Sequence, residues 1–217
     1  MAAVPWIQTR SGVAFDLLAP AADMVKREDI AHSLSRLARY SGHTIETWTV
    51  AEHSLLVADL LASWGCPAAV VREGLLHDAP ETYYGYTVSP VAAAMREILV
   101  GALDGVLDGM QVTGARGDAH MLDPLRRLRE CVDRVVRAAL SLPETETPIV
   151  KRADLVALAI ERRDLMVPCE RDWSLPEYAP RDWPRLVPAA GEAFSPGVKI
   201  GAAFLARWDA LDAEVLR

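Results

Sequence analysis

The chain has 217 residues, of which 51% are hydrophobic and 24% charged, and its formal net charge is −7. This length suits one globular domain, and the composition excludes an intrinsically disordered or collagen-like protein. The acidic balance argues against a polynucleotide or an anionic membrane as the main partner, so a phosphate ligand would need a local cationic site.

The first predicted element is a short hairpin, and helices follow it. Residues 6–18 alternate apolar and polar side chains around Ser11-Gly12, which is typical of a β-hairpin. Apolar residues at helical spacing predict an amphipathic helix from Asp29 to Tyr40, with Gly42 as its stop. The same periodicity predicts helices from about Val50 to Trp64 and from Ala68 to about Thr82.

The second half of the chain is also mainly helical. We expect helices at about 91–108, 120–140 and 146–167, with an exposed connection over 111–119. Residues 168–197 are rich in proline and tryptophan and indicate an ordered loop that covers the helical body, before a last helix at about 197–215. The prediction is an all-α single domain over 1–217, with its core at about 20–167 and a small N-terminal β-hairpin.

Two histidines and two aspartates form the candidate metal group. His53 lies in the second predicted helix, His77-Asp78 near the end of the third, and Asp154 in an apolar helical segment. Two imidazoles and two carboxylates suit one divalent first-row ion with open positions for water and substrate. Glu81 follows His77 by one helical turn and could transfer a proton. Spacing alone does not separate this site from ordinary packed or surface histidines.

The chain resembles the HD-domain metal-dependent phosphohydrolases, and among them the branch of bacterial 5′-deoxynucleotidases and phage-type deoxynucleotide phosphohydrolases. The likeness covers about residues 5–167. The motifs that carry it are Trp48-Thr-Val-Ala-Glu-His-Ser54, Leu75-Leu-His-Asp-Ala-Pro-Glu81 with Gly85 and Pro90 after it, Val150-Lys-Arg-Ala-Asp154, Asp29-Ile-Ala-His-Ser-Leu34 and Arg39-Tyr-Ser-Gly-His43.

The resemblance implies a role for each matched residue. Metal ligation is implied for His53, His77, Asp78 and Asp154, catalysis for Asp78 and Glu81, and substrate binding for Arg39 on a phosphate and Tyr40 on the sugar. Tyr86 departs from the pattern, because relatives usually have an aspartate after the glycine at that point. If that aspartate helps catalysis or contacts the sugar in the relatives, its replacement by Tyr86 affects both the rate and the choice of substrate.

Several other residues have two readings each. Lys151, one turn before Asp154, is either a phosphate contact or a solvated lysine. His43 is a candidate substrate contact, and the alternative is a position away from the substrate. We expect His32 to be a packing residue and His120 a surface residue. Glu161 belongs to a charge run typical of a solvated face, yet it also shares the helix face of Asp154. Trp173 and Trp183 either cover the core or form a lid over the substrate.

The resulting hypothesis is a cytoplasmic hydrolase of a small nucleotide, a deoxynucleoside mono- or triphosphate. It would use one divalent metal ion (Mn²⁺, Co²⁺, Mg²⁺, Zn²⁺ or Fe²⁺), bind no polynucleotide or membrane, and form a homo-oligomer. Widely spaced Cys66, Cys131 and Cys169 fit a reducing compartment. The alternatives are a two-metal HD enzyme, which needs further histidines, and a degenerate HD domain that binds nucleotides or acts as a scaffold without turnover.

Overall fold

The computed structural model describes residues 5–109, 123–171, 173–186 and 196–216. Within these ranges the chain is mainly helical with one two-stranded sheet, which confirms the predicted fold class. The elements in chain order are β1 (Trp6–Gln8), β2 (Ala14–Asp16), the 3-10 helix η1 (Ala22–Met24), α1 (Arg27–Leu34), the 3-10 helix η2 (Arg39–Gly42), α2 (Val50–Ser63), α3 (Ala68–Leu76), α4 (Glu81–Tyr84), α5 (Ser89–Gly109), α6 (Pro124–Ala139), α7 (Pro148–Leu165) and α8 (Pro196–Val215).

The predicted hairpin is present and is fastened to α1. Its strands pair antiparallel, with Ile7 opposite Phe15, and Gly12 adopts a positive φ of 89° in the turn. The backbone N–H and the hydroxyl of Ser11 each donate to the buried Asp29 carboxylate at 2.7 Å. Phe15 is fully buried and stacks on Tyr83 at a ring-centroid distance of 3.7 Å. The hairpin therefore packs on the helical core as part of the same body.

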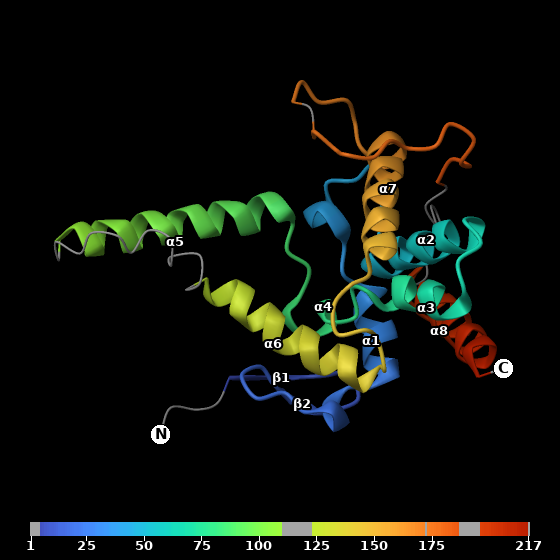
Figure 1. Ribbon diagram of the computed structural model, residues 1–217, viewed down its shortest axis with the longest axis horizontal. Helices are drawn as coiled ribbons and strands as arrows, with labels where there is room; N and C mark the ends of the chain where they lie inside the picture. Colours follow the sequence, from blue (N-terminus) through green and yellow to red (C-terminus); the bar gives the residue numbers. More distant parts are fainter. Residues whose placement is uncertain (1–4, 110–122, 172, 187–195, 217) are drawn as a thin grey trace.

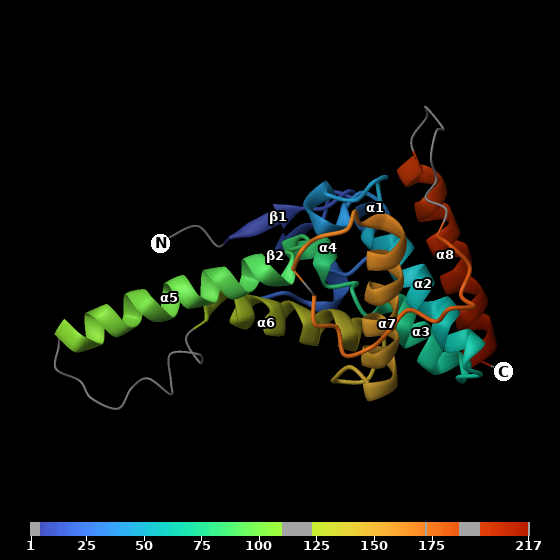
Figure 2. The ribbon, with the colours of Figure 1, turned by 90° about the horizontal axis from the view of Figure 1, so that it is seen from above.

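Helices α2, α3, α7 and α8 surround the main hydrophobic core (Figures 1 and 2). Apolar side chains of α2 such as Val57, Leu60 and Leu61 are fully buried there, as is Phe204 of α8. Helix α5 extends away from this core in both views, next to α6. No helix in the described part of the chain is long and apolar enough to cross a membrane.

Two predicted helices end earlier than the periodicity indicated. The helix expected over Asp29–Tyr40 ends at Leu34, because Ala38 forms a bridge with Thr49 and the Arg39 N–H donates to the Trp48 carbonyl. The helix expected to reach Thr82 ends at Leu76. Tight turns follow it into α4, since proline at position 80 lacks an amide hydrogen and disfavours helix before it.

The segment that precedes α8 runs along the end of α7. The Arg163 guanidinium donates to the carbonyls of Pro180, Trp183 and Pro184, and the Leu186 N–H donates to Asp164. The described part of this segment is irregular, as expected for a covering loop. The predicted connection 111–119 and His120 lie outside the described residues.

Candidate metal centre

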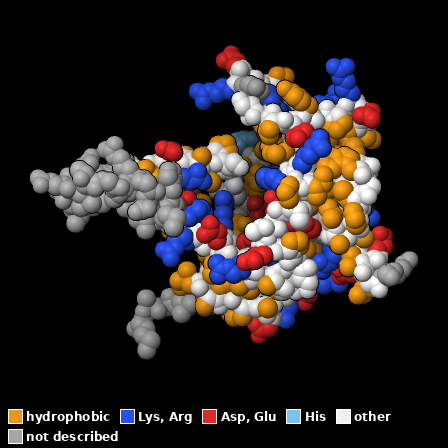
Figure 3. Space-filling model, viewed as in Figure 1, with side chains coloured by type: hydrophobic (Ala, Val, Ile, Leu, Met, Phe, Trp, Pro, Cys, Tyr) orange, Lys and Arg blue, Asp and Glu red, His pale blue; other side chains and the backbone are white. Residues whose placement is uncertain are grey.

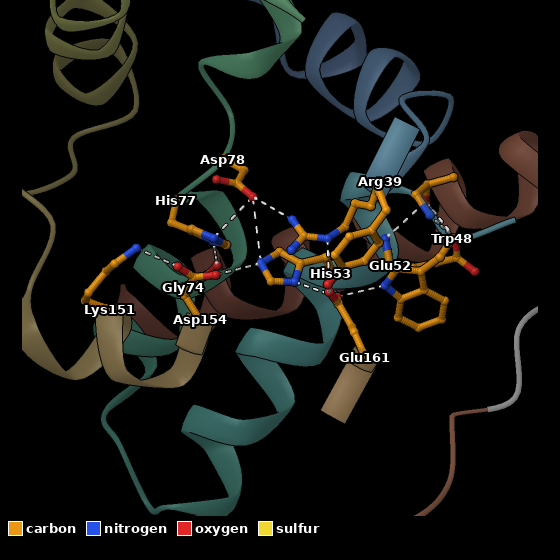
Figure 4. A network of polar contacts seen from close by, with 12 residues as sticks. Arg39, Trp48, Glu52, His53, Gly74, His77, Asp78, Lys151, Asp154 and Glu161 are labelled. Carbon is orange, nitrogen blue, oxygen red and sulfur yellow. Dashed lines mark hydrogen bonds and ion pairs between the residues drawn. The ribbon is translucent and has the colours of Figure 1, made fainter. Parts of the chain in front are cut away.

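Four side chains from three parts of the chain meet beside the core (Figure 4). His53 comes from α2, His77 and Asp78 directly follow α3, and Asp154 comes from α7. One ligand atom from each of His53, His77 and Asp154 lies within 4.8 Å of the other two. The Oδ2 atom of Asp78 is 3.3 Å from His77 Nε2 and 3.8 Å from His53 Nε2. Three residues thus form a group that could hold a metal ion, with Asp78 next to two of them.

Local structure fixes the start of each helix that carries a ligand. Thr49 and Glu52 form a reciprocal capping box, which places His53 in the first turn of α2. Thr147 caps α7 by position, and its N–H and hydroxyl donate to the buried Glu73 carboxylate at 2.9 and 2.8 Å. Glu73 lies on α3, so this contact joins the helix that leads to His77 with the helix that carries Asp154.

The two imidazoles are held in the same tautomer. His53 Nδ1 lies 2.7 Å from Glu161 Oε1, and His77 Nδ1 lies 2.7 Å from the Gly74 carbonyl. A carbonyl and an ionised carboxylate can only accept, so each Nδ1 carries the proton. Both Nε2 atoms are buried and have no hydrogen-bond partner among the described residues. Each Nε2 instead faces a carboxylate, His53 toward Asp154 at 3.2 Å and His77 toward Asp78 at 3.3 Å, and nitrogen and oxygen atoms arranged in this way are the donor set of a divalent metal site.

The electrostatics of the group call for a cation. Burial lowers the pKa of His77, but the neighbouring Asp78 carboxylate outweighs it and raises the pKa to about 10. Burial raises the pKa of Asp78, but His77 outweighs it and lowers the pKa to about 2. The pKa of Asp154 is likewise held well below its usual range by His53, against the effect of burial. The carboxylates therefore remain ionised and attract positive charge to this point.

Glu81 is the first residue of α4, and its N–H donates to the Asp78 carbonyl. The expected placement one turn along a continuous helix is wrong, because α3 ends before His77; the turn itself brings Glu81 back toward Asp78. Its Oε2 atom is buried without a hydrogen-bond partner in the described ranges. Burial, followed by the Asp78 charge, raises the pKa of Glu81 to about 9.

Arg39 is buried between two carboxylates. Its Nε donates to Glu161 at 3.1 Å, and one of its terminal nitrogens lies 3.8 Å from Asp78 Oδ2. Burial opposes its charge, but Glu161 and the other nearby acidic groups together outweigh burial and raise the pKa of Arg39 well above its usual value. The rings of Tyr40 and Tyr86 lie 5.3 and 5.4 Å from its guanidinium carbon. Tyr86, the departure from the family pattern, therefore lies against Arg39.

The remaining expected substrate residues fall into different places. Lys151 donates to Asp154 Oδ2 at 2.7 Å, so it contacts the ligand group, while its side chain is 55% exposed. His43 is exposed on the surface. The Tyr40 ring lies 5.7 Å from the Trp173 ring, whereas Trp183 packs against the core. His32 lines a separate cavity of about 410 Å³ beneath the hairpin.

Two residues can be assigned to the site only from the folded chain. Glu161 is fully buried, which excludes the solvated reading of its charge run. Burial raises its pKa, but Arg39, His53 and the Tyr40 hydroxyl together outweigh burial and lower the pKa to about 2. Arg129 of α6 lies 5.6 Å from the Tyr84 ring and acts electrostatically on Glu81, and its Nε is buried with no partner among the residues described here. Nothing distinguished it in the sequence from the other arginines of α6.

The face seen in Figure 3 is hollowed between α5 and α7, and both cationic and acidic side chains line the hollow.

No family model matches the chain. It is 30% identical over 175 residues to the uncharacterized protein YfdR of Escherichia coli, covering 81% of this chain and 80% of YfdR. It is 43% identical over 94 residues to an uncharacterized protein of Rhodobacter capsulatus, covering 42% of this chain and 48% of that protein.

Proposed function

The chain belongs to the family of Escherichia coli YfdR, and from the geometry of its site we propose that it is a metal-dependent phosphohydrolase. The observation that carries the proposal is the group of His53, His77 and Asp154, whose ligand atoms lie within 4.8 Å of one another, while neither Nε2 atom is hydrogen-bonded to a described residue. Each imidazole is fixed through Nδ1, as metal-ligating histidines usually are. Each Nε2 lies within 3.3 Å of a carboxylate oxygen, so nitrogen and oxygen donors for a divalent ion converge at this point.

The residues that would hold the ion are His53, His77, Asp78 and Asp154. Their mixed nitrogen and oxygen donors fit Mn²⁺, Co²⁺, Mg²⁺, Fe²⁺ or Zn²⁺ in a site with positions left for other ligands. When bound, such an ion supplies Lewis-acid stabilisation of phosphoryl oxygens and an activated water nucleophile.

The chain's own residues supply the other requirements of phosphoryl transfer. Arg39 directs a terminal nitrogen toward Asp78, so its guanidinium can grip phosphate oxygens next to the metal group. Glu81 has a buried, unpartnered Oε2, considering only the described ranges, and this atom can carry the proton that the reaction moves. Arg39 and Arg129 provide local positive charge within an acidic protein, which small anions need and which the net charge of −7 does not provide.

The substrate class in this proposal comes from the resemblance to HD-domain deoxynucleotidases. It is a small nucleotide, a deoxynucleoside mono- or triphosphate. The Tyr40 ring lies 5.3 Å from the Arg39 guanidinium carbon and 5.7 Å from the Trp173 ring, so these two rings can offer an aromatic surface to a sugar or base. A cytoplasmic location and self-association remain predictions from the sequence.

The test is a hydrolysis assay of purified protein with Mn²⁺, Co²⁺ or Mg²⁺ against a panel of deoxynucleotides and ribonucleotides. We expect metal-dependent release of phosphate, and a loss of about 100-fold or more in His77→Ala and Asp78→Ala. His32→Ala is the matched control, because this histidine lies outside the metal group, and its activity should equal the wild type. Activity that survives both ligand substitutions would exclude the mechanism. Nucleotide binding without turnover in the metal-loaded protein would instead favour a degenerate binding module.

A further inference from the structure

Glu161 is the point where the metal group and the arginine are joined. Its carboxylate is fully buried on α7 and accepts from four donors on three segments of the chain (Figure 4). The four donor groups are Arg39 Nε, the Tyr40 hydroxyl, Trp48 Nε1 and His53 Nδ1. A carboxylate has about four lone-pair sites, so this one is fully occupied by protein donors and has no capacity left for a metal or a substrate.

The donors divide between the two oxygens. Oε1 accepts from His53 Nδ1 at 2.7 Å and from Trp48 Nε1 at 2.8 Å, whereas Oε2 accepts from Arg39 Nε at 3.1 Å and from the Tyr40 hydroxyl. One oxygen thus fixes a metal-ligating imidazole, and the other fixes the guanidinium that faces phosphate. Rotation of the Glu161 carboxylate would disturb both sides together.

We propose that Glu161 is a positioning residue that couples metal binding to phosphate binding. This inference rests on the proposed function. Glu161 accepts from His53 Nδ1, so that Nε2, the atom that would ligate a metal ion, faces Asp154 at 3.2 Å. It also occupies the Nε of Arg39, so that the two terminal nitrogens remain for an anion on the side of Asp78. In this proposal Glu161 itself contacts neither the metal ion nor the phosphate.

Glu161→Gln is the informative change, because it keeps the shape and removes the charge. A glutamine amide presents an NH₂ group to one of the two donor pairs, so it can satisfy either the His53 side or the Arg39 side but not both. Loss of a partner that orients a metal-ligating histidine typically costs about 10–100-fold in metal affinity. We expect a loss of this size for Mn²⁺, together with weaker binding of inorganic phosphate to the Mn²⁺-loaded protein.

Asp164→Asn is the matched control on the same helix. The Asp164 side chain is 2% exposed and also accepts from several donors, but these belong to Arg163, Arg185 and Leu186 at the covering segment. Its substitution should lower stability and leave Mn²⁺ affinity unchanged. Mn²⁺ affinity is measured on the full chain by the loss of the free-ion EPR signal. The affinity of the Mn²⁺-loaded protein for inorganic phosphate is measured on the same samples, and folding by circular dichroism.

The outcomes separate this inference from the proposed function. A folded Glu161→Gln protein that binds Mn²⁺ and phosphate like the wild type, while His77→Ala binds no Mn²⁺, overturns the role of Glu161 and leaves the metal site standing. A wild type that binds no Mn²⁺ overturns both. If Glu161→Gln does not fold, the Zn²⁺-loaded wild type is examined by NMR of ¹⁵N-labelled imidazoles. A proton on His53 Nδ1 supports the inference, and a metal on that atom overturns it.

Discussion

Gly74→Ala should loosen the contact between the two helices that lead to His53 and His77. Gly74 lies on α3 against α2, where a Cβ atom would be 2.2 Å from Leu61 Cδ1 and 3.2 Å from Val57 Cγ1. Leu61 is the flexible end of this contact, but both it and Val57 are fully buried. A close-packed interior leaves little room for Leu61 to move aside.

The expected cost follows from two opposed effects. Overpacking of this kind costs about 1–3 kcal/mol, and a contact of 2.2 Å belongs at the upper end. Alanine in place of glycine within a helix returns about 1 kcal/mol. The net loss in the free energy of unfolding is therefore about 2 kcal/mol, which corresponds to a fall in Tm of about 4–8 °C for a chain of this size.

Gly74→Ala should also alter the geometry of the metal group. The Gly74 carbonyl accepts from His77 Nδ1, and the rings of His53 and His77 are 5.3 Å apart. Displacement of α3 away from α2 would widen this separation, so Mn²⁺ affinity should fall along with stability.

A double-mutant cycle with Leu61→Ala tests the cause. In a Leu61→Ala background the clash is absent, and Gly74→Ala should be neutral or stabilising by up to about 1 kcal/mol. Urea denaturation of the four proteins should therefore show a coupling of at least about 2 kcal/mol. If Gly74→Ala costs the same with leucine and with alanine at position 61, steric contact with Leu61 is not the reason and the argument is refuted.

Two further predictions concern other charged contacts. Arg137→Met leaves the buried Glu73 carboxylate without the guanidinium that lies 3.0 Å from it, and should cost about 3–5 kcal/mol in urea denaturation; a loss below about 1 kcal/mol would contradict this. Burial raises the pKa of Asp164, but its bonds to Arg163 outweigh this and lower the pKa to about 2, from an ordinary 3.8. Its contribution, about 1 kcal/mol after solvent screening, is thus present above pH 4 and lost as the pH falls toward 2. The stability difference between wild type and Asp164→Asn should vanish over this range, and a constant difference would contradict the assignment.

Local patterns in the sequence were sufficient for the helical fold class, the hairpin and the chemical types of the candidate ligands. Apolar periodicity acts over a few residues, and so does the turn at Gly12. The same patterns misplaced the ends of α1 and α3. The end of α1 depends on pairing with residues further along the chain, such as Thr49 with Ala38, whereas the end of α3 follows from the proline at position 80, which apolar periodicity does not take into account.

Only the tertiary structure decided how the site is held together. The sequence placed Glu161 in a charge run typical of a solvated face, although it shares the helix face of Asp154. In the folded chain Glu161 meets His53, 108 positions away in the chain, and Arg39, 122 positions away. Two further contacts likewise could not be identified from the sequence. These are the hydrogen bond of the Gly74 carbonyl with His77 Nδ1 and the contact of the Arg129 guanidinium with the Tyr84 ring. Residue type limits which bonds a side chain can form, but packing of distant segments determines which partners it meets in the buried interior, where most polar groups are hydrogen-bonded.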